Sequence, residues 1–184
     1  MSNQFRTCPF TIYRDSMEQT PWSFKGLTTD SKQGNHPIVI PVVWRGLGQG
    51  MGDYSIAGME DKETGWKISI ERKSLADLYG TLLAGRDRFK RELASLARMQ
   101  SAHVVVEADW LDVLQYNPKH WLTHSEAKRE AIRKSVRRSI VAWSIDFPTV
   151  HWWLMPDRRA AEVVAFRILY KFWERQNDQK TLRD

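Results

Sequence analysis

The pattern of hydrophobic and polar positions along the chain predicts a mixed α/β fold. Residues 102–107 (AHVVVE) form a nearly continuous apolar run, typical of a strand buried on both faces of a sheet. Residues 66–73 (WKISIERK) alternate apolar and polar side chains, which predicts a half-buried strand. Further strands are expected at 10–14, 38–44, 53–57 and 150–155, and helices at 75–83, 89–96, from 109, at 125–143 and from 157. This order favours a central mixed sheet of about five strands flanked by helices.

Two helix starts carry capping signals. Ser74 and Asp77 have the spacing of a capping box for the helix that follows them, so Asp77 has a structural interpretation as well as a chemical one. Thr123 and Glu126 have the same spacing at the start of the long helix.

Composition and charge narrow the function classes. The 184 residues, 42% of them hydrophobic, are enough for one domain with a packed core, and the net charge of +6 favours a polyanionic partner, nucleic acid first. Cys8 is the single cysteine, which excludes an intrachain disulfide and a cysteine metal cage and agrees with a reducing compartment such as the cytoplasm. No segment approaches the roughly 20 apolar residues of a membrane span, so no membrane partner is expected.

Candidate chemistry lies in the strand expected at 66–73. Because side chains alternate along a strand, Glu71 and Lys73 share a face, and Asp53 comes from a neighbouring strand end. Two carboxylates suit a hard divalent cation, and a lysine adds a point charge beside a phosphate, as metal-assisted phosphodiester cleavage requires. The alternative is that Glu71 and Lys73 form the solvated face of an edge strand.

Three segments around these residues resemble the nuclease domain of the XPF-type structure-specific endonucleases: 52–54 (GDY), 71–78 (ERKSLADL) and 85–89 (GRDRF). Residues 15–22 (DSMEQTPW) resemble the opening motif of that family, so the likeness runs from about 13 to 107. The resemblance implies a restriction-endonuclease-like sheet, dependence on Mg²⁺ or Mn²⁺, and cleavage of branched, flapped or forked DNA.

By matching position, the resemblance implies an acidic cluster and a catalytic lysine, Lys73. Asp53 and Glu71 would be the principal metal ligands and Asp15 a further one, with Glu18 and Arg72 completing the catalytic set, while Asp77 and Arg86 would shape the site or contact phosphate. Asp15 and Glu18 also fit a turn before Pro21.

One position departs from the family pattern. Met17 stands where the family usually has arginine, and methionine donates no hydrogen bond to phosphate. Either Arg14 substitutes from nearby or this edge of the site is altered.

Basic residues gather on the two helices expected at 85–96 and 125–143. A solvated face and a phosphate-tracking face both account for them. The residues expected to contact DNA are Arg86, Arg88, Arg133, Lys134, Arg137 and Arg138. Trp152 and Trp153 are candidates to stack on unpaired bases, but adjacent strand residues face opposite ways, so at least one of them is expected to pack in the core.

Two other motifs have less specific patterns. In residues 46–52 (GLGQGMG), Met51 stands where a dinucleotide loop has its third glycine and a strand follows, so we expect a mobile loop beside the site. His120 and His124 have a helical metal spacing, but Trp121 replaces the glutamate of the zinc-protease motif, which disfavours a zinc site.

The prediction is therefore a single nuclease domain over 1–184, with its motif core at about 13–107 and the fold completed by 108–184. Family members usually carry a helix-hairpin-helix DNA-binding tail, for which too few residues follow Pro156, so the chain resembles the stand-alone versions of phages and mobile elements. A homodimer is expected by analogy. The alternatives are a DNA-binding or partner subunit that keeps the fold without the chemistry, and a broad degradative nuclease.

Overall fold

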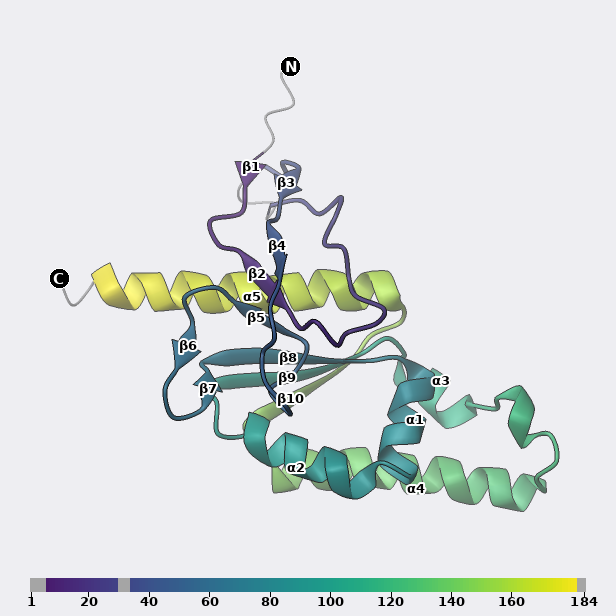
Figure 1. The fold of residues 1–184 in the computed structure, drawn as a ribbon. Helices are drawn as coiled ribbons and strands as arrows, with labels where there is room; N and C mark the ends of the chain where they lie inside the picture. Colours follow the sequence, from purple (N-terminus) through teal and green to yellow (C-terminus); the bar gives the residue numbers. More distant parts are fainter. Residues whose placement is uncertain (1–5, 30–33, 182–184) are drawn as a thin grey trace.

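A central sheet with helices on both faces organises the molecule (Figure 1). The computed structural model describes residues 6–29 and 34–181. Helix α5 (Arg158–Thr181) covers one face of the sheet, and helices α1 (Leu75–Leu83), α2 (Arg86–Leu96) and α4 (Glu126–Asp146) lie on the other, with the short helix α3 (Trp110–Gln115) beside them. A 3-10 turn at Lys119–Trp121 leads toward α4.

The sheet has six strands of mixed direction. Their order is β10 (Val150–Leu154), β9 (Ser101–Val106), β8 (Ile68–Lys73), β5 (Tyr54–Ile56), β2 (Ile12–Arg14) and β4 (Val42–Trp44). Strands β10, β9 and β8 run parallel, β5 is antiparallel to both β8 and β2, and β2 is parallel to β4. The predicted class, an α/β fold with a mixed central sheet flanked by helices, is therefore confirmed.

Two small ladders stand apart from this sheet. Strand β1 (Arg6–Thr7) pairs with β3 (Ile38–Val39), and β6 (Glu60–Asp61) forms a hairpin with β7 (Gly65–Trp66).

Each face of the sheet has its own hydrophobic core. Phe89, Leu93 and Trp143 belong to the core under α1, α2 and α4, whereas Trp22 and Phe166 belong to the core under α5. Strand β9 contributes Val104 to the first core and Val105 to the second, because its side chains alternate. The strand at 102–106 is buried on both faces, as predicted.

The strand predicted at 66–73 differs from expectation in one respect. It begins at Ile68, and all six of its residues are buried, because β8 lies between β9 and β5 with helices over both faces. The prediction of a half-buried strand was therefore wrong, and so was the alternative that Glu71 and Lys73 form the solvated face of an edge strand.

The strand predicted at 38–44 is two strands, separated at residues 40 and 41. Pro41 has no backbone N–H to donate, and its carbonyl accepts from the N–H of Ile12. Before this break β3 pairs with β1, and after it β4 pairs with β2.

The cap of the long helix also differs from expectation. Ser125, and not Thr123, accepts a hydrogen bond from the N–H of Lys128. The preceding turn continues to His124, whose N–H donates to the carbonyl of Trp121, so the helix starts two residues later than the Thr123 cap requires. Across the described residues, no helix is long and apolar enough to span a membrane.

Candidate active site

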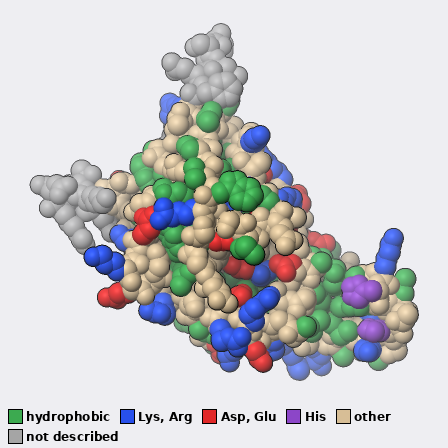
Figure 2. Space-filling model, in the orientation of Figure 1, with side chains coloured by type: hydrophobic (Ala, Val, Ile, Leu, Met, Phe, Trp, Pro, Cys, Tyr) green, Lys and Arg blue, Asp and Glu red, His purple; other side chains and the backbone are tan. Residues whose placement is uncertain are grey.

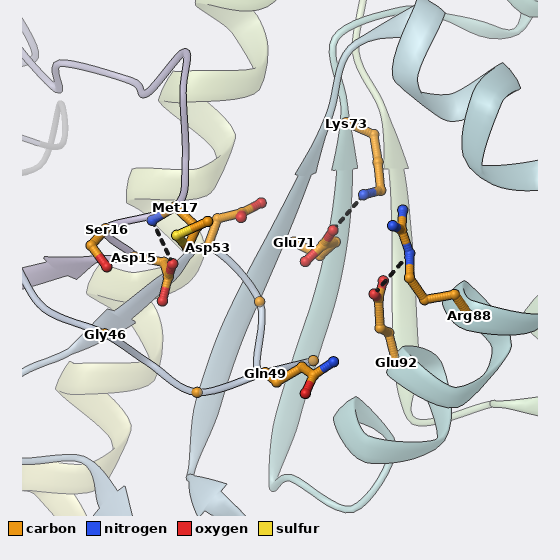
Figure 3. Close-up of a pocket in the computed structure, with 13 residues that line it drawn as sticks. Asp15, Ser16, Met17, Gly46, Gln49, Asp53, Glu71, Lys73, Arg88 and Glu92 are labelled. Atoms are coloured by element: carbon orange, nitrogen blue, oxygen red, sulfur yellow. Dashed lines mark hydrogen bonds and ion pairs between the residues drawn. The ribbon is translucent and has the colours of Figure 1, made fainter. Parts of the chain in front are cut away.

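A cavity of about 480 Å³ opens where β5 and β8 meet helix α2 and the glycine-rich loop at 46–52. Its charged lining consists of Asp15, Asp53, Glu71, Lys73, Arg88 and Glu92 (Figure 3). In the space-filling view, acidic and basic side chains meet in the recess at the centre of this face (Figure 2). The structure thus brings five of the predicted site residues into one cavity.

Glu71 and Lys73 lie at the C-terminal end of β8, and both line this cavity. The Lys73 Nζ donates to Glu71 Oε1 at 2.5 Å (Figure 3). It also lies 3.6 Å from Asp77 Oδ2. Burial lowers the pKa of Lys73, but the Glu71 and Asp77 carboxylates raise it, and the net result lies above the ordinary value. Lys73 is therefore a buried ammonium group that its neighbours keep charged.

Asp53 reaches the cavity from the residue before β5. Its backbone N–H donates to the carbonyl of Ile70, and its Oδ2 accepts from the backbone N–H of Arg72 at 2.7 Å. Burial and the facing Glu71 carboxylate raise the pKa of Asp53 well above its usual range, and burial also raises that of Glu71. Two carboxylates thus face each other in a place where their negative charges repel.

The donor atoms of this pair fit a hard divalent cation. Within the described part of the chain, no hydrogen bond reaches Asp53 Oδ1 or Glu71 Oε2, so each carboxylate keeps one oxygen for a ligand. The same described residues contain no group of three or more His, Cys, Asp or Glu side chains placed to hold a metal ion. A cation such as Mg²⁺ binds in proteins through one or two carboxylates and takes its other ligands from water and substrate phosphate, which matches this donor set.

Gly52 fixes the approach of Asp53. Its φ is +80°, and an added Cβ would lie 2.2 Å from Ser69 Oγ and 3.0 Å from the Ile70 carbonyl oxygen. The Ser69 hydroxyl in turn donates to the carbonyl of Met51 at 2.5 Å. The glycine-rich loop therefore packs directly on β8 beside the site, where the sequence predicted it.

Asp15 lines the same cavity, but both of its carboxylate oxygens accept backbone N–H groups. Oδ1 accepts from Met17 at 2.8 Å and Oδ2 from Leu47 at 2.7 Å, so Asp15 joins its own turn to the glycine-rich loop. Met17 is 81% exposed at the mouth of the cavity. Arg14 does not substitute for the missing arginine, because its guanidinium lies over the Trp44 ring, 3.5 Å from the centroid.

Arg72 and Glu18 line a neighbouring cavity of about 540 Å³, which also includes Asp77. Arg72 donates from Nε and Nη2 to Glu107 at 2.8 and 2.7 Å, and its Nη1 lies 3.4 Å from Glu18 Oε1. Both cavities share Met17 and Arg88 in their linings, so they adjoin at the end of β8. Glu18 and Arg72 therefore lie beside the Asp53–Glu71–Lys73 cavity and not within it.

Asp77 lies at the cap of α1 and beside Lys73. Its backbone N–H donates to the Ser74 hydroxyl at 3.2 Å, which caps α1, and its carboxylate faces Lys73.

Two acidic residues of this region were missed from the sequence. Glu107 accepts from the indole N–H of Trp22 at 2.8 Å and from Arg158 Nη1 at 2.7 Å, in addition to its bonds from Arg72. Its position directly after the buried strand 102–106 was the available signal. Glu92 lies one helical turn after Arg88, 3.5 Å from its Nε, and faces the Glu71 cavity.

The predicted DNA-contacting residues fall into different environments. Arg133 is buried and paired with Glu126 at 2.5 Å and Glu130 at 3.0 Å, and Arg137 lies 3.3 Å from Glu130. Arg86 donates to the hydroxyl of Ser139, and its guanidinium lies over the ring of Trp143. A groove of about 590 Å³ between α1 and α4 is bordered by Arg86, Lys134 and Arg138. Arg88 belongs instead to the active-site cavity.

Comparisons with known proteins show similarity at the level of structure. No protein-family model matches the sequence, and no curated protein does. Among solved structures, XPF from Aeropyrum pernix matches with a TM-score of 0.57 and 18% sequence identity over 94% of this chain and 69% of that one. XPF from Aeropyrum pernix in complex with DNA matches with a TM-score of 0.54 and 16% identity, over 91% of this chain and 66% of that one. The chain therefore has an XPF-like fold, as its motifs implied.

Proposed function

We propose that this protein is a divalent-metal-dependent DNA endonuclease that hydrolyses phosphodiester bonds in branched, flapped or forked DNA. The observation that supports this most directly is the meeting of Asp53, Glu71 and Lys73 in one cavity. The XPF-like fold, one example of which was solved in complex with DNA, supports nucleic acid as the partner.

The proposed chemistry divides between the carboxylates and the lysine. Asp53 and Glu71 would hold Mg²⁺ or Mn²⁺ through oxygen atoms. When bound, the cation would supply the Lewis acidity that phosphodiester hydrolysis requires. Lys73, a charged ammonium in a buried place, offers its charge to a phosphate oxygen as negative charge develops there.

The other predicted catalytic residues act in this proposal as positioning residues. The backbone N–H of Arg72 holds Asp53, and its guanidinium is held by Glu107 and Glu18. Asp15 holds the glycine-rich loop against the mouth of the cavity, whose lining it shares with Asp53 and Glu71. Arg88 supplies positive charge at the rim.

DNA would reach the site along basic residues on this side of the molecule. Lys134 and Arg138 are exposed and border one groove, which suits contacts with the phosphate backbone. Arg133 is not part of the proposed contact, because two glutamates already neutralise its charge.

We also propose a homodimer, formed through helices α3 and α4. Trp110, Leu114 and Val141 line one shallow cavity there, and Ile145 is 76% exposed on the same helix as Val141. Covering such an apolar face is favourable. Light scattering across protein concentrations should show a dimer that Ile145→Asp dissociates, and a monomer at all concentrations would contradict this.

A cleavage panel tests the proposed activity. Flap, fork, four-way and linear duplex DNA are incubated with the full chain in Mg²⁺, Mn²⁺ or EDTA. We expect cutting of the branched forms in either metal, no cutting in EDTA, and products with a 3′-hydroxyl and a 5′-phosphate, as the family resemblance implies. Asp53→Asn should abolish cutting and Asp61→Asn, in the β6–β7 hairpin and outside the lining of the cavity, should not. Full activity of Asp53→Asn would remove the proposed site, and equal cutting of linear duplex would favour a broad degradative nuclease.

A second candidate is a DNA-binding subunit that keeps the fold without the chemistry. The absence of a third metal-holding side chain among the described residues, and Met17 at the mouth of the site, favour this alternative. Metal-independent binding to branched DNA with no cleavage in any metal would support it. Action in the cytoplasm of a bacterial or phage-infected cell stays a prediction that rests on the sequence.

A further inference from the structure

An exposed tryptophan lies at the end of strand β4, beside the active-site cavity. Trp44 is 62% exposed, more than any other tryptophan of the described residues. It is the last residue of β4, which forms one edge of the central sheet. The chain reaches Gly46, in the lining of the active-site cavity, two residues later, so the Cα atoms of Trp44 and Gly46 lie at most about 7 Å apart.

A cation holds the Trp44 ring from one side. Arg14 is the last residue of β2 and the register partner of Trp44 in the parallel ladder, and its guanidinium carbon lies 3.5 Å from the ring centroid. The backbone N–H of Arg45 donates to the carbonyl of Arg14 at 2.9 Å, so the two strand ends stay joined at this point. A guanidinium over an aromatic face is attracted to it. Arg14 therefore covers one side of the ring, while the side chain as a whole stays open to solvent.

The charge of Arg14 is not neutralised by a carboxylate. Its guanidinium forms no ion pair or hydrogen bond with any described residue, and its Nε is buried without a partner. Arg45 differs, since its Nη2 lies 3.8 Å from Glu60 Oε1. Buried polar atoms in folded proteins usually have a hydrogen-bond partner, so Arg14 is a cation with capacity for a ligand. The next residue after it, Asp15, already lines the active-site cavity.

The two tryptophans that the sequence suggested for base stacking lie at the opposite edge of the sheet. Both belong to β10, whereas β4 ends the sheet on the other side. Trp152 packs edge-on against Phe89, with 6.2 Å between ring centroids, and the indole N–H of Trp153 donates to His103 Nδ1 at 3.1 Å. Trp152 is thus the core residue expected of this pair, and Trp44 is the exposed tryptophan that adjoins the active-site cavity.

We propose that Trp44 and Arg14 bind an unpaired nucleotide of branched DNA, next to the linkage that is cut. The base would stack on the open side of the Trp44 ring, and the positive charge of Arg14 would attract an adjoining phosphate. Aromatic side chains with basic neighbours bind single strands in this way, because every base has a face to stack and every linkage carries a charge. Bases inside a duplex stack on each other and do not offer that face. The pair would therefore favour a branch point over continuous duplex.

A strand of another protein chain fits this place less well. Exposed edge strands can pair with a strand from outside, but β4 has only three residues, with Pro41 directly before it and Gly46 shortly after it. The charge of Arg14 also favours a polyanion over an apolar second copy of the chain.

The inference rests on the proposed function for the choice of DNA as ligand, since a branched substrate supplies unpaired nucleotides. Its test is a binding measurement in EDTA, which needs no cleavage. Failure of the nuclease proposal and failure of this one are therefore seen separately.

Fluorescence anisotropy compares a labelled fork, with two unpaired arms, and a linear duplex of equal length. For the full chain, Trp44→Ala should weaken fork binding about tenfold and leave duplex binding within about twofold. Trp44→Phe should restore most of the affinity, because it keeps an aromatic ring. The matched control is Val43→Ala, which removes a 47% exposed side chain from the same strand on the opposite face, and it should change neither affinity.

Further arms identify which part of the nucleotide is bound. A fork that lacks the bases next to its junction should bind wild type about tenfold more weakly than the intact fork, and Trp44→Ala should bind the two forks alike. Arg14→Gln should lower the slope of log affinity against log salt for the fork by about 1. Should Trp44→Ala fail to fold, Trp44→Leu, which keeps an apolar side chain without an aromatic face, must show the same tenfold loss.

Unchanged fork affinity in a folded Trp44→Ala, an equal loss on the linear duplex, or an unchanged salt slope in Arg14→Gln would each overturn the proposal. A change in the oligomeric state of Trp44→Ala, measured by light scattering, would assign β4 to a second copy of the chain and would overturn it as well.

Discussion

At the scale of single residues, the position of Asp53 depends on the absence of a side chain at Gly52. The left-handed backbone there is strained for any other residue, and the space beside it is filled by Ser69 and the backbone of β8. The backbone at Gly52 therefore packs directly against β8, and this packing positions the Asp53 carboxylate in the cavity.

Gly52→Ala should therefore lower both stability and cleavage. We expect the free energy of unfolding to fall by about 1–3 kcal/mol, because the new Cβ must displace Ser69 in a strained backbone. Gly46→Ala is the matched control, since that glycine has open space around it and no left-handed φ. Urea denaturation with equal midpoints for the two variants would contradict this account.

His103 is a second residue whose environment sets a measurable property. Burial, and then the neighbouring His151, lower the pKa of His103 from 6.5 to about 4. Among the described residues, the lining of the cavity beside it includes Arg167, Lys171 and Arg175 and no carboxylate.

This lowered pKa predicts how stability depends on pH. Between pH 6.5 and about 4 the unfolded chain holds a proton on His103 that the folded chain does not. The free energy of unfolding should therefore fall as the pH is lowered through that window, by about 3 kcal/mol at most, and the contribution levels off below it. His103→Gln should flatten this part of the curve, and the exposed His120→Gln should not. An unchanged slope in His103→Gln would refute the assignment.

At the scale of elements, Glu107 at the end of β9 joins three parts of the fold. It accepts hydrogen bonds from Arg72 on β8, from Trp22 in the N-terminal segment and from Arg158 at the start of α5. Because Arg72 also supplies the backbone N–H that holds Asp53, this network sits directly behind the site.

Glu107→Gln should cost about 3–5 kcal/mol of unfolding free energy, because it removes the closer of the two carboxylates that pair with the buried Arg72 guanidinium. Glu130→Gln removes a half-exposed carboxylate that also pairs with two arginines, and should cost less than about 1 kcal/mol. Denaturation midpoints give both values. A small loss in Glu107→Gln would mean that water replaces the carboxylate.

How far the sequence predicts the elements depends on whether the signal is local. The helices at 75–83 and 125–143 have periodic patterns, and the buried strand at 102–107 has a nearly continuous apolar run, so these three elements were predicted. The shared face of Glu71 and Lys73 was also predicted, because it follows from strand alternation. The break at Pro41 and the Ser125 cap depend on partners or on the preceding turn, so they were not predicted. Glu107 and Glu92 were missed for the same reason, since their roles come from residues distant in sequence or from the adjoining strand.

At the scale of the whole molecule, we expect only a few exposed basic residues to contact DNA, although the net charge of the chain is positive. Lys134 and Arg138 border one groove of α4, whereas Arg133 of the same helix is neutralised by glutamates. The helix thus carries both proposed contacts and an internal control.

Lys134→Ala and Arg138→Ala should each weaken duplex DNA binding and lower the slope of log affinity against log salt by about 1. Arg133→Ala should leave that slope unchanged while reducing stability, because its charge is already paired. Anisotropy titrations at several salt concentrations measure the slopes. If Arg133→Ala changed the slope as much as the other two, the proposed contact surface would be wrong.

The most direct test of the account is the DNA cleavage rate of Lys73→Met in Mg²⁺, with folding checked by circular dichroism and DNA binding by anisotropy. The variant keeps the length of the side chain and removes the ammonium group that faces Glu71. Its matched control is Lys67→Met, at the residue directly before β8. We predict a loss of cleavage of about 10²–10³-fold in Lys73→Met, with DNA binding retained and Lys67→Met within about twofold of wild type. Wild-type cleavage by a folded Lys73→Met would contradict the account.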